Sequence, residues 1–169
     1  MHNCALPIAA GLNPHGQLDE DSQERALGCL KRFGERLRGF PPHTVRAVGT
    51  NTHRVAGNAS AFLKKAEAAI GFPIEIIAGY EEARLIYLGV AHSLPASTNA
   101  RLVVDIGGGS TELIIGNRLK PVKLESLYMG CVSYSLRFFP DGKFTKGALR
   151  LAERSEEGRV GNGWHSRRG

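Results

Sequence analysis

The residues with the clearest chemical potential are an acid and a glycine-rich turn between two apolar runs. Asp105 lies at the end of the apolar run Leu102–Ile106, next to its last residue. Gly107–Ser110 follow, and a second apolar run comes directly after the acid Glu112. This pattern predicts a strand, a tight turn and a second strand. Glycines without Cβ atoms let backbone amides approach an anion closely, and a hydroxyl adds a donor. A carboxylate beside such a turn repels phosphate unless it holds a metal or orients a water, so the pattern favours magnesium-dependent phosphate chemistry. The alternative is a glycine-rich hairpin with an ordinary surface acid.

The elements before this turn alternate between helix and strand. Acids and a capping residue at 19–22 precede apolar residues at helical spacing up to Leu37, and Gly39 closes that helix. Short apolar runs at 45–50 and 73–78 predict buried strands, and a helix capped by Asn58 or Ser60 lies between them. Another helix begins near residue 81. This order predicts βαβ units on a mostly parallel sheet, with ligands at the carboxyl ends of the strands.

The alternation stops at the small, polar segment 93–100, which is typical of a linker. Consecutive strands at 102–106, 112–115 and 120–127 follow, and then helices at 132–138 and 145–157. We therefore expect an α/β protein with an incomplete first lobe at 1–97 and the beginning of a second lobe at 98–157. Residues 158–169 hold four glycines and no periodicity, which predicts a disordered tail or one foreign to the rest of the chain.

Composition excludes several classes of function. The chain has 169 residues, 42% hydrophobic and 22% charged, and no apolar run reaches the roughly 18 residues of a membrane helix. Its first residues lack the basic leader and apolar centre of a secretory signal, so we expect a cytoplasmic protein. Three of the six net positive charges come from the tail, and no basic stripe is interleaved with aromatic residues, which argues against nucleic-acid binding. The cysteines and histidines show no zinc-ligand spacing.

Four motifs in collinear order carry a resemblance to a known family. They are Val48–Arg54, Gly79–Val90, Val104–Glu112 and Met129–Ser133. Together they resemble the successive motifs of the exopolyphosphatase and guanosine pentaphosphate phosphatase family, over roughly residues 10–155. The resemblance implies the actin-like fold of sugar kinases and chaperone ATPases, in which two lobes close on a cleft. It also implies magnesium-dependent hydrolysis of the terminal phosphate of polyphosphate or of guanosine pentaphosphate.

The resemblance also implies roles for particular residues. Glu82 aligns with the base that deprotonates or orients the attacking water, and Arg54 with a phosphate-binding arginine. Asp105 and Glu112 resemble the acids that hold magnesium and the nucleophilic water. Gly107, Gly108, Gly109 and Ser110 resemble the second phosphate loop. On local sequence alone, Glu82 and its neighbour Glu81 are better explained as acids that stabilise a helix N-terminus, and Arg54 is equally well explained as a solvated loop residue. The Met129–Ser133 turn is interpreted as structural.

One departure from the family pattern is expected to impair the activity of this chain. The family's opening phosphate loop, an Asp-Leu-Gly-Ser-Asn-Ser pattern, has no counterpart in residues 1–9, which contain no glycine and no acid. We therefore interpret the chain as an N-terminally truncated fragment, with strand edges that favour dimers or aggregates, from a protein expected to be a homodimer at full length. Exopolyphosphatase is the first hypothesis. Guanosine pentaphosphate phosphatase is the second, and a catalytically silent chain that binds polyanions is the third; a sugar kinase fits less well.

Overall fold

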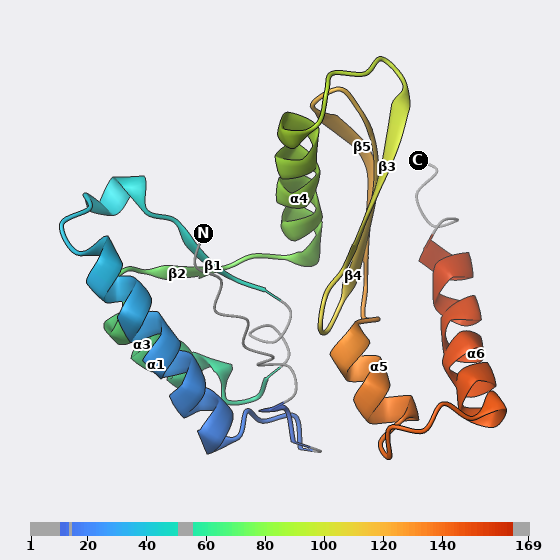
Figure 1. The fold of residues 1–169 in the computed structure, drawn as a ribbon, viewed down its shortest axis with the longest axis horizontal. Helices are drawn as coiled ribbons and strands as arrows, with labels where there is room; N and C mark the ends of the chain where they lie inside the picture. The colour runs from blue at the N-terminus through green and yellow to red at the C-terminus, as the bar shows by residue number, and fades with distance from the viewer. Residues whose placement is uncertain (1–10, 14, 51–55, 164–169) are drawn as a thin grey trace. The chain divides into compact units, whose positions relative to one another are not determined.

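The computed structural model describes residues 11–13, 15–50 and 56–163, with side chains up to residue 155. The chain forms two compact units, residues 1–78 and 79–169. The first contains α1 (Glu20–Leu37), the 3-10 turn η2 (Pro42–Thr44), β1 (Ala47–Gly49), α3 (Ala59–Ile70) and β2 (Ile74–Ile76). The second contains α4 (Gly79–Ser93), β3 (Ala100–Ile106), β4 (Thr111–Asn117), β5 (Lys120–Leu127), α5 (Cys131–Phe138) and α6 (Lys146–Gly163) (Figure 1). Each predicted helix and strand is confirmed, with small differences at the ends.

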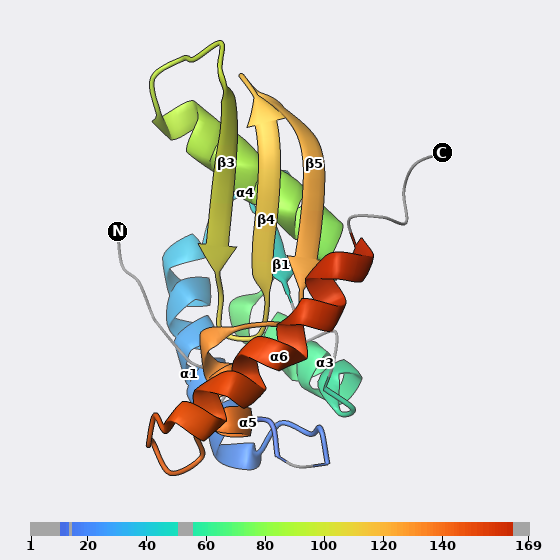
Figure 2. The same ribbon diagram turned by 90° about the vertical axis from the view of Figure 1, so that its right-hand side faces the viewer.

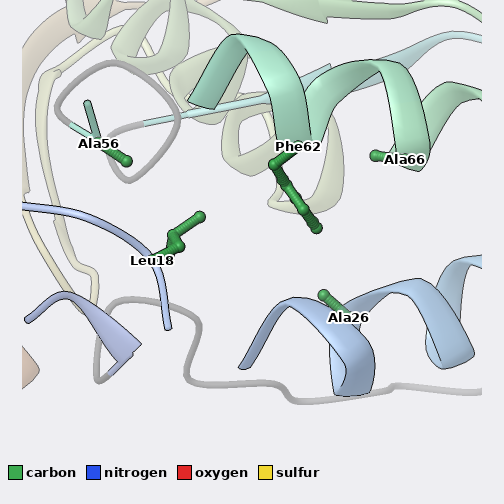
Figure 3. Packing of buried hydrophobic residues seen from close by; sticks show 5 residues of the cluster. All are labelled: Leu18, Ala26, Ala56, Phe62 and Ala66. Carbon is green, nitrogen blue, oxygen red and sulfur yellow. The ribbon is translucent and has the colours of Figure 1, made fainter. Parts of the chain in front are cut away.

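Two helices form the core of the first unit. Asp19 is the N-cap of α1, where its carboxylate accepts a hydrogen bond of 2.6 Å from the Ser22 amide. Phe62 of α3 is 1% exposed and lies between Ala26 of α1 and Leu18 (Figure 3). Small alanines at the contact let the two helices approach, and the buried apolar area stabilises their packing.

The two short strands of this unit are parallel, as predicted. Val48 of β1 pairs with Glu75 of β2, and α3 is the crossover between the strands. Asn58 occupies the N-cap position of α3, but the prediction that its side chain caps the helix is wrong. The Asn58 side chain instead contacts a residue forty positions earlier in the chain. Its Oδ1 accepts a hydrogen bond from the Leu18 amide and its Nδ2 donates one to the Leu18 carbonyl, both at 2.9 Å. Asn58 thus fixes the loop before α1 to the start of α3.

The second unit is an antiparallel sheet in the order β3-β4-β5 (Figure 2). Helix α4 lies on one face of it, and alternate residues along each strand point to that face. Ala83, Tyr87 and Ala91 of α4 pack there against Val103 and Ile114. The close approach requires Gly116 in β4, because a Cβ at that position would lie 2.3 Å from the Tyr87 ring.

The unit boundary differs from the predicted lobe boundary. The sequence predicted a division at 97/98, after the helix, whereas the compact units divide at 78/79, before it. The reason is that α4 packs on the sheet that follows it rather than on the strands that precede it. The division of the chain into two lobes stays a prediction. Helix α6 also continues to Gly163, through the first half of the segment predicted to lack periodic structure.

Candidate active site

A row of polar side chains crosses the three-stranded sheet at one end. Asp105 of β3 pairs with Glu112 of β4, and Glu112 pairs with Ser126 of β5. Directly opposed residues in an antiparallel sheet have Cβ atoms about 5 Å apart. The row lies two residues along from Val103 and Ile114, so it shares the face covered by α4. Strand register therefore brings together two acids that lie on separate strands.

Glu112 is the most constrained of these acids. Its side chain is 1% exposed, and the Ser126 hydroxyl donates a 2.9 Å hydrogen bond to its Oε1. Burial raises the pKa of the Glu112 carboxyl, and the negative charges of Glu82 and Asp105 raise it further; hydrogen bonds from Ser126 and Ser110 oppose this rise. Glu82 and Asp105 thus lie close enough to Glu112 for their charges to raise the pKa of its carboxyl.

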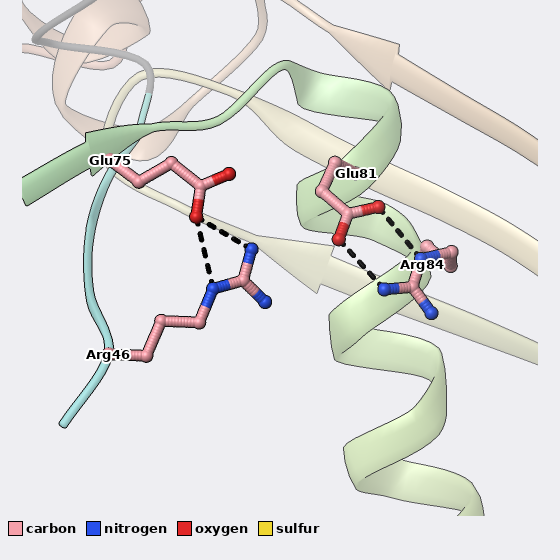
Figure 4. Close-up of polar contacts among 4 residues, drawn as sticks. All are labelled: Arg46, Glu75, Glu81 and Arg84. Atoms are coloured by element: carbon pink, nitrogen blue, oxygen red, sulfur yellow. Dashed lines mark hydrogen bonds and ion pairs between the residues drawn. The ribbon is translucent and has the colours of Figure 1, made fainter. Parts of the chain in front are cut away.

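The adjacent acids at the start of α4 have different surroundings. Glu81 forms a two-point ion pair with Arg84, with Arg84 Nε 2.7 Å from Glu81 Oε2 and Nη2 2.8 Å from Oε1 (Figure 4). It stabilises its own helix, as the alternative interpretation of both acids expected. Glu82 is distinguished by its effect on Glu112 across the sheet face. The structure thereby distinguishes Glu81, which pairs within its own helix, from Glu82, which belongs with the acids Asp105 and Glu112.

The glycine loop between β3 and β4 turns its carbonyl groups toward helix α5. The Gly107 amide donates to the Ser110 carbonyl at 2.9 Å and closes the turn. The amides of Cys131 and Val132 donate to the carbonyls of Gly107 and Gly108, also at 2.9 Å. Among the described residues, the amides of Gly108 and Gly109 have no protein acceptor. They are donors of the kind that binds an anion.

The turn before α5 supports this loop through very close packing. A Cβ on Gly130 would lie 2.4 Å from the backbone of Gly108 and Gly109. The Thr111 hydroxyl donates to the Met129 carbonyl, and the Ser133 amide donates to the Gly108 carbonyl at 3.0 Å. The Met129–Ser133 segment therefore holds the loop in shape. Its contribution to the site is structural rather than chemical.

Two of the sequence-based assignments are not placed by the structure. Arg54 lies at 51–55, outside the described residues. Within the described part of the chain, no group of three or more Asp, Glu, His or Cys side chains is arranged to hold a metal ion. Magnesium ligation by Asp105 and Glu112 stays a prediction.

Ser126 and Gly130 were not singled out as site residues by the sequence. Ser126 contacts Glu112 only because of the β4–β5 register, and nothing in the local sequence around Ser126 reveals that register. Gly130 belongs to the fourth motif, so its presence was noted there. The hint was a glycine directly before a predicted helix, where a polar cap is the commoner choice.

The fold and these side chains define an α/β protein with a glycine-loop hairpin beside clustered carboxylates. The chain belongs to the Ppx/GppA phosphatase family, whose model matches residues 3–161. The match extends beyond both ends of the region of resemblance expected from the motifs. No helix among the described residues is long and apolar enough to cross a membrane.

Solved structures of the family share this fold. The Ppx/GppA enzyme of Aquifex aeolicus is 32% identical with a TM-score of 0.67, and the match covers 90% of this chain and 51% of that one. An exopolyphosphatase-like protein is 25% identical with a TM-score of 0.82, and the match covers 92% of this chain and 49% of that one. An exopolyphosphatase from Cytophaga hutchinsonii is 32% identical with a TM-score of 0.68, and the match covers 77% of this chain and 43% of that one. These matches confirm the predicted actin-like α/β class. The chain spans about half the length of these relatives.

Proposed function

We propose that this chain carries part of the active site of a phosphoanhydride hydrolase that releases the terminal phosphate of inorganic polyphosphate. The observation that carries the proposal is the convergence of Glu82, Asp105 and Glu112 beside a loop in which the Gly108 and Gly109 amides have no acceptor within the described part of the chain. Membership of the Ppx/GppA phosphatase family supports it. Phosphoryl transfer relies mainly on positioning and on charge stabilisation, which is what such groups supply.

Each group has a distinct task in this proposal. Glu82 accepts a proton from the attacking water or orients it, and the amides of Gly108 and Gly109 donate to phosphate oxygens. Asp105 and the buried Glu112 lie opposite each other on β3 and β4, on the same face of the sheet, and the Ser126 hydroxyl donates to one oxygen of Glu112. Arg54 is the proposed second contact to phosphate, because its planar fork suits two oxygens.

The carboxylates suit magnesium in type, because Mg²⁺ prefers oxygen ligands. It commonly takes one or two carboxylates and completes its shell with waters and substrate phosphate, so a group of three protein ligands is not required. Asp105 and Glu112 are the residues proposed to hold it. Bound there, magnesium would neutralise charge on the phosphate.

Polyphosphate is preferred to guanosine pentaphosphate as the substrate. The exopolyphosphatase from Cytophaga hutchinsonii is 32% identical over the matched region, and the Gly-Gly-Gly-Ser turn resembles that branch. Turnover of long polyphosphate and of guanosine pentaphosphate, measured side by side, tests the choice. Faster turnover of the nucleotide would reverse it.

The experiment uses the chain extended by an N-terminal hairpin that carries the family's opening phosphate loop. It compares this extended chain with its Glu82→Gln variant, and Glu81→Gln is the matched control. Binding of polyphosphate is measured by calorimetry, and magnesium-dependent phosphate release by a colorimetric assay. Glu82→Gln should bind polyphosphate but lose turnover by roughly 10²–10⁴-fold, as expected for a lost general base. Glu81→Gln should keep both, because Glu81 pairs with Arg84.

Two results of this experiment count against hydrolysis. An extended chain without either substitution that neither binds polyphosphate nor releases phosphate would refute the proposal. Binding without release would favour the third hypothesis, a silent polyanion-binding chain. That hypothesis draws on the observation that the chain spans about half the length of its solved relatives.

A further inference from the structure

Glu112 is the acid of the candidate site that protein atoms enclose most fully. It is 1% exposed, so bulk water contributes little to fixing the orientation of its side chain. The Ser126 hydroxyl donates to its Oε1 at 2.9 Å, and the Ser110 side chain forms a second hydrogen bond with it. A carboxylate can accept about four hydrogen bonds or ligand contacts. Two hydroxyl donors therefore leave acceptor sites on Glu112 for a cation.

The β4–β5 register determines where Ser126 lies. Ser126 pairs directly with Glu112, and directly opposed residues have Cβ atoms about 5 Å apart. The adjacent residues of β5, Glu125 and Leu127, alternate to the other face of the sheet. A side chain as short as serine reaches Glu112 from β5 only at this opposed position. The hydrogen bond is thus a consequence of strand pairing within the second unit.

Ser126 and Asp105 lie on opposite sides of Glu112. Asp105 pairs with Glu112 from β3 and Ser126 pairs with it from β5. Adjacent strands are about 4.8 Å apart, so two strand spacings, about 10 Å, separate Asp105 from Ser126. An ion held between Asp105 and Glu112 would have Glu112 between itself and Ser126. Ser126 is therefore placed to act on Glu112 rather than on the ion.

We propose that Ser126 is a positioning residue that holds Glu112 in the orientation in which it binds magnesium. The inference rests on the proposed function in one respect, the assignment of that ion to Asp105 and Glu112. A ligand side chain that is already held by a hydrogen bond loses less freedom when the ion binds. Partners of this kind orient metal ligands in many proteins, although they do not contact the metal.

The test is binding of Mn²⁺ to the 169-residue chain without substrate. Mn²⁺ takes the same oxygen ligands as Mg²⁺, and its electron paramagnetic resonance signal reports the free ion. Ser126→Ala removes the hydroxyl, and Ser126→Thr retains it. Ser126→Val matches the shape of Ser126→Thr but has no hydroxyl. Comparison of the last two variants separates the hydrogen bond from side-chain packing.

Ser126→Ala and Ser126→Val should each raise the dissociation constant for Mn²⁺ by about 10–100-fold, the usual effect of removing the partner of a metal ligand. Ser126→Thr should bind Mn²⁺ nearly as tightly as wild type. Ser93→Ala is the control within the same unit, because the Ser93 hydroxyl donates to the backbone carbonyl of Gly89 at the end of α4. It should not change the affinity. Circular dichroism should show that each variant is folded.

Three results would overturn the inference. Unchanged affinity in both Ser126→Ala and Ser126→Val would do so and would leave the proposed function standing. Equal weakening by Ser126→Thr and Ser126→Val would indicate a packing effect instead of the hydrogen bond. A wild-type chain that binds no Mn²⁺ would refute the inference together with the magnesium ion of the proposed function. Since the measurement uses no substrate, its result is independent of whether the extended chain hydrolyses polyphosphate.

Discussion

The substitution Gly130→Ala tests whether the turn before α5 shapes the glycine loop. Gly130 is the N-cap of α5 with φ −123° and ψ 159°, an extended conformation that alanine adopts without strain. The new methyl group would meet the carbonyl carbon and oxygen of Gly108 and the nitrogen of Gly109 at 2.4 Å. Ordinary carbon contacts lie near 3.5–4.0 Å, so the loop or the helix must move by about 1 Å.

The expected cost has two parts. Overpacking of a well-packed site typically costs about 1–3 kcal/mol, and backbone atoms cannot relieve it by changing rotamer. Alanine is also a poorer N-cap than glycine, by roughly 1 kcal/mol at most. We therefore expect Gly130→Ala to lower the free energy of unfolding by about 1–4 kcal/mol. Amide resonances of Gly107–Gly109 should shift.

Urea unfolding followed by circular dichroism measures the loss, and Gly89→Ala is the matched control. Gly89 lies within α4, and a Cβ there meets no atom within 4 Å. Alanine should raise stability at that position by up to about 1 kcal/mol, through helix propensity. If Gly130→Ala cost no more than the capping difference and left the loop resonances in place, the close packing of loop and helix would be refuted.

Three further substitutions test the buried polar contacts. Glu112→Gln should raise stability at pH 7 relative to wild type. Burial raises the pKa of Glu112 in the folded state, so the wild-type protein loses folding stability as pH rises through that pKa. The stability that Glu112→Gln gains over wild type is about 1.4 kcal/mol for each unit by which the pKa is raised. This gain should vanish in urea titrations below about pH 4. Tyr87→Phe removes a hydrogen bond to a backbone carbonyl and should cost about 1 kcal/mol in thermal unfolding, whereas exposed Tyr80→Phe should cost less than about 0.5 kcal/mol. Asn58→Ala should cost about 1–3 kcal/mol in urea unfolding, because it leaves the amide of buried Leu18 without a partner, whereas the Leu18 carbonyl keeps its hydrogen bond from Gln23; an unchanged midpoint would contradict this.

Local sequence was sufficient for the helices and strands because their signals are local. Acids and a cap before an apolar periodicity identified α1, and Gly39 after it has a φ of +90°, a conformation that favours glycine. The unit boundary could not be predicted in this way. Whether α4 packs forward or backward depends on Tyr87 fitting over Gly116, a contact between residues far apart in the chain.

The candidate site was only partly predictable for the same reason. The resemblance to the family singled out Glu82, Asp105 and Glu112 as site acids, but their proximity depends on one strand register and on the face that α4 covers. Asn58 shows the opposite case, in which a residue with strong local capping preference is used for a long-range contact. Local propensity is a weak prior where a buried backbone group needs a partner.

The buried acid links the structure to the proposed chemistry. Burial of Glu112 with Glu82 and Asp105 nearby disfavours its ionised form, and the Ser126 hydroxyl offsets only part of that cost. A group that destabilises its own charged form gains when a cation or a proton neutralises it. The proposed magnesium would therefore bind where the fold has concentrated negative charge beside donor amides. Phosphate, which those carboxylates repel, would bind there together with the cation rather than alone.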